Sequence, residues 1–66
     1  MILETTNYKN IPLTFVAANI TAINRHQTDD DKTNIWVVGS EDEFVVTESY
    51  NTIKYKLLAA LGGVKK

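Results

Sequence analysis

The chain has 66 residues, enough for one small domain spanning residues 1–66 and for no second domain. It contains no cysteine, which excludes a disulfide framework and a cysteine-ligated zinc site. Seven basic and eight acidic residues nearly cancel, which argues against a chain whose main task is to bind phosphate backbones. A core this small supplies only roughly 3–5 kcal/mol of net stability, so we expect oligomerisation to add to it.

Two features bear on location. The first six residues lack the basic start and long apolar stretch of a signal peptide. The longest uninterrupted apolar run, residues 57–61, is far too short to span a bilayer. We therefore expect a soluble, cytoplasmic protein without a membrane partner.

The N-terminal quarter predicts two strands joined by a tight turn. Residues 2–5 form a short extended segment, and the turn formers of residues 7–10 follow. Residues 11–15 then alternate apolar and polar side chains, the pattern of a half-buried strand. Pro12 has no N–H to donate, which favours an edge position for this strand.

The next segment predicts a second hairpin. Ala17-Ala18-Asn19 indicates a turn into a strand over residues 20–26, followed by a polar loop at 27–32. Within that loop, three consecutive aspartates begin a spacing that resembles a calcium loop. Asn34 stands where such a loop needs glycine and Ser40 where it needs glutamate. We interpret the run as a solvated loop and expect no metal site.

The centre of the chain predicts a third hairpin, with strands at residues 35–38 and 44–47 around a turn containing Gly39. Both strands carry apolar residues on both faces. Ile35 faces one way and Trp36 the other, and Val45 opposes its two apolar neighbours. The second face needs a cover, either from closure of the strands into a barrel or from another chain.

A C-terminal helix over about residues 49–61 is the clearest single element. Ser49 is a favourable N-cap, and an apolar stripe follows at Tyr50, Ile53, Leu57 and Leu61. Gly62-Gly63 is typical of a helix end, with residues 64–66 as a short tail. The predicted fold is mainly β with one C-terminal helix: a small curled antiparallel sheet or partial barrel of about four to five strands.

No motif predicts catalysis or a cofactor. His26 is the only histidine, and a general base needs a nucleophile and an orienting acid beside it. Ser40 and Ser49 lie in turn and cap contexts, and no phosphate-binding loop is present. We expect no enzyme, no catalytic residues and no cofactor.

The predicted interaction residues are Trp36, Val38, Val45 and Tyr8. Aromatic residues are enriched in subunit interfaces. We therefore expect a small regulatory or scaffolding protein that forms homo-oligomers and binds a protein partner. The alternative, less favoured because acids lie close to the scattered basic residues, is a small nucleic-acid-binding barrel that uses Trp36, the tyrosines and the lysines.

The order of segments resembles a family of very small bacterial proteins of flagellar and swarming motility. The similar features are Met1-Ile2 with Thr5, the pair Ile20 and Ile23, the block 35–39, and residues 44–49 with Glu48-Ser49 ahead of the helix. Lys9-Asn10 replaces the Asn-Gly usual in the family's first hairpin. The resemblance implies a regulatory or accessory protein without a catalytic site. Similar compact chains occur in phages, so we expect a bacterial or phage origin.

Overall fold

The computed structural model describes residues 1–62, and the predictions for Gly63 and for the tail at 64–66 lie outside this range. The described residues form five strands, one short 3₁₀ turn and one α-helix. Their bounds are β1 Ile2–Thr6, β2 Pro12–Val16, η1 Ala17–Asn19, β3 Ile20–Arg25, β4 Thr33–Val37, β5 Phe44–Val46 and α1 Tyr50–Ala60. The predicted class, mainly β with a C-terminal helix, is confirmed.

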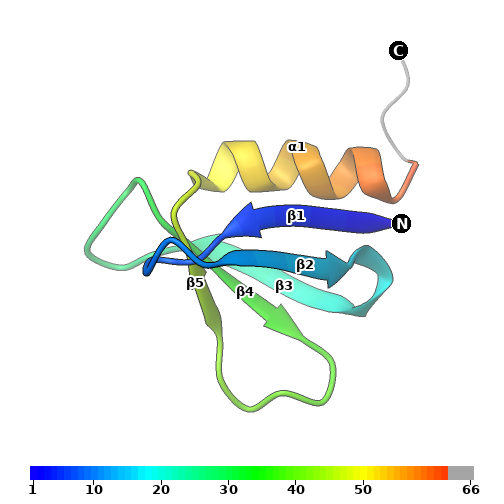
Figure 1. Ribbon diagram of the computed structural model, residues 1–66, viewed down its shortest axis with the longest axis horizontal. Coiled ribbons are helices and arrows are strands. Elements are labelled where there is room, and N and C mark those ends of the chain that lie inside the picture. The colour runs from blue at the N-terminus through cyan, green and yellow to red at the C-terminus, as the bar shows by residue number, and fades with distance from the viewer. Residues whose placement is uncertain (63–66) are drawn as a thin grey trace.

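The strands form two antiparallel sheets, β1–β2 and β3–β4–β5, which are not closed into a barrel. They meet where Asn7 bridges to Val46 and the Tyr8 N–H donates to the Val45 carbonyl at 3.3 Å. This junction connects the end of β1 to the β5 edge of the three-stranded sheet. Helix α1 lies along β1 and packs against β1 and β3 (Figure 1).

The turn between β1 and β2 is built by two asparagines. Asn7 Oδ1 accepts hydrogen bonds from the Lys9 and Ile11 N–H groups, at 2.8 and 3.0 Å. Asn10 has φ +66°, a left-handed conformation that asparagine tolerates better than most residues. Asn10 therefore supplies the backbone geometry that glycine would otherwise provide. The β2 strand pairs only with β1, so the predicted edge position of Pro12 is confirmed.

The core lies between the curled strands and the helix. Its buried side chains come from both sheets and from α1: Leu3, Phe15, Ile35, Val46 and Ile53. Phe15 also meets Phe44 edge to face, with ring centroids 5.3 Å apart. In β2 the expected alternation is confirmed at Phe15, which is buried, and at Leu13, which is partly buried, whereas Ile11 precedes the strand and is 51% exposed. In β4, which was expected to be apolar on both faces, Ile35 is the buried residue.

The helix begins as predicted and packs differently. Ser49 caps it, since its Oγ accepts the Thr52 N–H at 3.3 Å. Ile53 is fully buried, Leu57 is partly buried against the core, and Leu61 is 55% exposed. The expected four-residue stripe is therefore wrong at its C-terminal end, because the last turn extends past the core. Gly62 has φ +75° and ends the described helix as expected.

No helix within residues 1–62 is long and apolar enough to cross a membrane.

Candidate interaction surface

The outer face of the three-stranded sheet is the surface opposite the core. Because side chains alternate along a strand, residues next to the buried Ile35 and Val46 point outward. Asn34 stands opposite Asn24 on β3 and opposite Val45 on β5, and Trp36 stands opposite Ala22. We call these five residues (Ala22, Asn24, Asn34, Trp36 and Val45) the outer face.

Trp36 lies in a cavity of about 380 Å³ on the outer face. It is half-buried, and the side chains around it are polar. They comprise three amides, one hydroxyl, two basic or ring-nitrogen groups and one carboxylate: Asn24, Gln27, Asn34, Thr28, Arg25, His26 and Glu43. The outer face therefore presents one large aromatic ring framed by hydrogen-bonding groups.

Asn34 is the polar residue at the centre of this face. Its Oδ1 atom is buried and has no hydrogen-bond partner within residues 1–62. A buried polar atom without a partner is costly, and such atoms are uncommon in folded proteins. Because this atom is buried, a group from another molecule cannot reach it unless the surrounding side chains move.

Tyr8 and Val45 line a second cavity of about 360 Å³, together with Asp29 and Lys32. The Tyr8 ring is 56% exposed, and the Lys9 ammonium lies 5.6 Å from its centroid. His26 and Thr28 line both this cavity and the Trp36 cavity, so the two adjoin. The fold therefore brings three of the four predicted interaction residues onto one continuous surface.

Val38 lies elsewhere. Its N–H donates to the Asn19 carbonyl at 2.8 Å, and its side chain is 63% exposed. It lines a different cavity with Val16 and Phe44, between β2 and the β4–β5 hairpin. Since β4 ends at Val37 and the chain turns at Gly39, where φ is +82°, Val38 does not extend the surface of Trp36.

The predicted loop between β3 and β4 is held by local hydrogen bonds. Asp29 accepts the Asp31 N–H at 3.0 Å and pairs with the Lys32 ammonium. Hydrogen bonds from Lys32 and Asp31 hold the pKa of the Asp29 carboxyl below its ordinary value. In residues 1–62 no group of three or more potential metal ligands is present.

The hydrogen bonds of the His26 ring stay within its own loop. Its Nδ1 accepts the Thr28 N–H at 3.3 Å, with the Thr28 hydroxyl at the same distance. No carboxylate of the described chain hydrogen-bonds to the His26 ring. The geometry gives His26 a role in closing the loop, and it assembles no acid–base pair around it.

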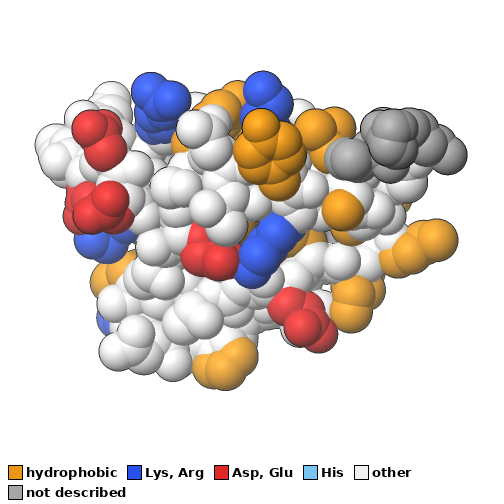
Figure 2. Space-filling view, turned by 90° about the horizontal axis from the view of Figure 1, so that it is seen from above, with side chains coloured by type: hydrophobic (Ala, Val, Ile, Leu, Met, Phe, Trp, Pro, Cys, Tyr) orange, Lys and Arg blue, Asp and Glu red, His pale blue; other side chains and the backbone are white. Residues whose placement is uncertain are grey.

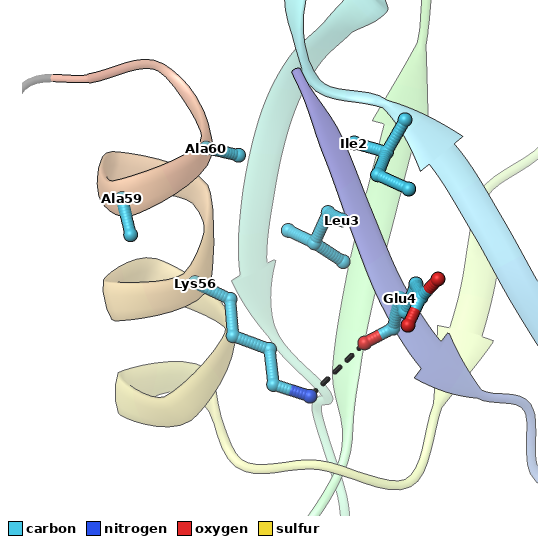
Figure 3. A pocket seen from close by; sticks show the side chains of 6 residues that line it. All are labelled: Ile2, Leu3, Glu4, Lys56, Ala59 and Ala60. Atoms are coloured by element: carbon cyan, nitrogen blue, oxygen red, sulfur yellow. Dashed lines mark hydrogen bonds between the residues drawn. The ribbon is translucent and has the colours of Figure 1, made fainter.

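Another cavity, of about 510 Å³, lies between β1 and α1 (Figure 3). Ile2 and Leu3 line it from the strand, and Ala59 and Ala60 line it from the helix. Lys56 is the cationic residue that lines this cavity, and its ammonium group is already hydrogen-bonded. Lys56 Nζ donates to the Glu4 carbonyl at 3.0 Å and to Glu48 Oε1 at 2.7 Å. This cavity therefore belongs to the packing of the helix.

Glu48 connects three elements at the entrance to α1. Its carboxylate accepts from Lys56 and from Thr5 Oγ1, and its backbone carbonyl accepts from Thr33 Oγ1 at 2.7 Å. Burial raises the pKa of Glu48, but the hydrogen bonds from Lys56 and Thr5 and the Lys56 charge outweigh it and leave the pKa below its ordinary value.

An apolar patch lies on the helix side of the molecule, away from the Trp36 cavity. Figure 2 shows hydrophobic side chains gathered toward the end where β1 begins and α1 finishes. The exposed residues of these elements are Met1, Ile2, Tyr55, Leu58 and Leu61. This helix patch is the competing surface for association.

The sequence interpretation missed the polar members of the site. Asn24, Asn34, Gln27 and Glu43 look like solvated positions, and only their alternation with Ile23 and Ile35 indicates that the two asparagines share a face with Trp36. Comparison of the chain with models of protein families, with curated proteins and with solved structures found no match. The resemblance to small motility proteins stays a prediction.

Proposed function

We propose that the protein is a non-catalytic interaction module that assembles with copies of itself through the outer face and acts as a small regulatory or scaffolding protein for a protein partner. The observation that carries this proposal is the joining of Trp36, Val45 and Tyr8 by two adjoining cavities on one side of the sheet. Aromatic residues in such positions are the usual anchors of protein interfaces.

The distribution of apolar surface supports association. Within residues 1–62, six hydrophobic residues are buried, whereas ten large hydrophobic residues are exposed. A domain with so little buried apolar area gains stability when a second chain covers part of the rest. Assembly would thus add to the stability of the fold as well as serve its function.

The experiment is sedimentation equilibrium at micromolar concentration, combined with the emission spectrum of Trp36, the only tryptophan. We expect an oligomer whose emission is blue-shifted relative to a water-exposed indole, with a red shift on dilution. If the protein is a monomer at all concentrations and its Trp36 emission does not change on dilution, the proposal is contradicted.

Binding of single-stranded nucleic acid is the second candidate. It is favoured by the exposed Tyr8 ring with Lys9 beside it and Lys32 in the same cavity. Against it, Lys32 is paired with Asp29, and Glu43 lies beside Trp36. Quenching of Trp36 by an oligothymidine, weakening steeply as salt is raised, would favour this candidate over self-assembly.

A further inference from the structure

We propose that the free edge of β2 binds an extended segment of the protein partner, which adds to the sheet as a further strand. The segment places apolar side chains in the groove beside β2 and a basic residue near the acidic loop between β4 and β5. This names the class of partner and rests on the part of the proposed function that assigns a protein partner. The surface is separate from the outer face.

The hydrogen bonds of the first hairpin show which way the backbone of β2 points. The Ala17 N–H donates to the Met1 carbonyl at 2.8 Å, and the Asn7 N–H donates to the Ile11 carbonyl at 2.9 Å. Along an antiparallel ladder, hydrogen-bonded pairs alternate with non-bonded pairs. Thr14 is three residues from Ala17 and three from Ile11, so it belongs to a non-bonded pair. Its N–H and C=O groups therefore point away from β1.

The contacts of β1 agree with this alternation. Glu4 stands opposite Thr14, and its carbonyl accepts from Lys56 Nζ at 3.0 Å. The Thr6 carbonyl likewise accepts the Thr47 N–H at 2.9 Å. The outer edge of β1 is thus occupied by the chain itself. Within residues 1–62, by contrast, β2 pairs only with β1, and no backbone hydrogen bond engages the outward groups of Thr14.

The free edge of β2 presents groups at a two-residue spacing: the Pro12 carbonyl, both groups of Thr14 and the Val16 N–H. An extended peptide backbone carries its own donors and acceptors at this spacing, so it can form four hydrogen bonds here. The register of β2 is regular over the whole strand. The free edge of β3 is interrupted by a register shift between Ile20 and Ala22, and such irregularities protect an edge from pairing.

An apolar groove of about 270 Å³ lies beside this edge, between β2 and the β4–β5 hairpin. Leu13 and Phe15 line it from β2, and Val38 and Phe44 line it from the hairpin. Val38 is 63% exposed and Phe44 is 38% exposed. In an added strand, the residues opposite Leu13 and Phe15 point to the same side as these two. A segment with an apolar residue at every second position therefore covers the groove.

The loop between β4 and β5 gives the groove a negative end. It starts after Val38 and stops before Phe44, and it contains Glu41, Asp42 and Glu43 but no basic residue. All three acids are exposed, and none forms an ion pair within residues 1–62. Charge complementarity therefore favours a lysine or arginine at one end of the bound segment.

The probe is a library of random heptapeptides displayed on phage and selected against the full chain. We expect the enriched sequences to carry apolar residues at every second position and a basic residue at one end. Selection without this pattern would overturn the inference.

Fluorescence anisotropy of a labelled enriched peptide then tests the edge itself. Thr14→Pro removes the outward N–H and leaves the bonds to β1 in place, and we expect the dissociation constant to rise at least tenfold. Thr14→Val keeps the N–H and is the matched control, with no more than about a twofold change. Val38→Asn changes only the groove and should weaken binding about fivefold.

N-methylation of the peptide gives a test that does not depend on folding of a variant. Methylation of the amides that face β2 should abolish binding, whereas methylation of the alternate amides should leave it within about twofold. Equal effects of the two methylated peptides would overturn the inference.

Circular dichroism verifies that each variant is folded, and sedimentation equilibrium separates this inference from self-assembly. Unchanged peptide binding by folded Thr14→Pro would overturn the inference. Loss of self-association in Thr14→Pro would also overturn it, because a second copy would then occupy the edge. A monomeric parent that binds the peptide would contradict self-assembly and support this inference.

Discussion

Thr5 Oγ1 donates a 2.6 Å hydrogen bond to Glu48 Oε1, which connects the first strand to the residue before the cap of α1. The two residues are 43 positions apart in the chain. Lys56 donates to the same carboxylate from the helix. One side chain therefore sets how the helix lies on β1, and its protonation loosens that connection.

The pKa of Glu48 is lowered in the folded protein, so its contribution to stability is present above the pKa of the unfolded chain and is lost as the pH falls through the folded value. We expect the free energy of unfolding of Glu48→Gln to lie below that of the parent at pH 7. The two should converge once the pH has fallen through the folded pKa of Glu48, which lies below the ordinary value of the carboxyl. Urea unfolding from pH 7 to pH 3 measures this, with Glu4→Gln as a control on the neighbouring strand. If the free energies of unfolding of the parent and of Glu48→Gln differed by the same amount at every pH, this role of Glu48 would be contradicted.

Ile53 anchors the helix, since its side chain is fully buried in the core. Ile53→Ala should cost roughly 2–5 kcal/mol through lost transfer energy and the cavity left behind. The matched control is Leu61→Ala on the exposed last turn, for which we expect under about 0.5 kcal/mol. Chemical denaturation provides both values. Similar losses at the two positions would show that the helix docks through its whole apolar stripe.

Asn10 occupies a left-handed conformation in the first turn, at φ +66°. An alanine side chain there meets a steric penalty of about 1–2 kcal/mol, whereas glycine meets none. We expect Asn10→Ala to lower the melting temperature and Asn10→Gly to keep or raise it. Equal effects of the two substitutions would be inconsistent with this turn geometry.

Hydrogen bonds within the aspartate loop hold its conformation, and we predict that the loop does not bind a metal ion. Replacing Asp29, Asp30 and Asp31 by asparagine keeps the acceptor for the Asp31 N–H and removes the Lys32 ion pair. The fold should persist, and millimolar calcium should leave the melting temperature of parent and variant unchanged. A calcium-induced rise in the parent that the variant lacks would reveal a metal site.

The sequence predicted the strands and turns well, because patterns of neighbouring side chains determine these elements. Alternation predicted that Ile35 and Trp36 lie on opposite faces, and the structure buries Ile35 and leaves Trp36 half-buried on the outer face. The predicted turn at residues 17–19 is a short 3₁₀ helix leading into β3. The expected antiparallel hairpins between β3, β4 and β5 are confirmed.

The candidate surface depends on long-range contacts that no local pattern contains. Tyr8 reaches Val45 only because Asn7 bridges to Val46 across the two sheets. Val38 lies apart from the surface around Trp36, because its N–H donates a hydrogen bond to the Asn19 carbonyl. The exposure of Leu61 reflects a helix longer than the core beneath it, which periodicity alone does not reveal.

The central claim is self-association through the outer face, and one comparison tests it most directly. Trp36→Lys places a charge at the centre of the proposed interface, which is strongly unfavourable once water is excluded. Tyr55→Lys places the same charge on the helix patch, where the side chain is 66% exposed. By sedimentation equilibrium, we predict that Trp36→Lys is a folded monomer and that Tyr55→Lys associates like the parent. Dissociation by Tyr55→Lys, with Trp36→Lys still associated, would contradict the account and move the interface to the helix.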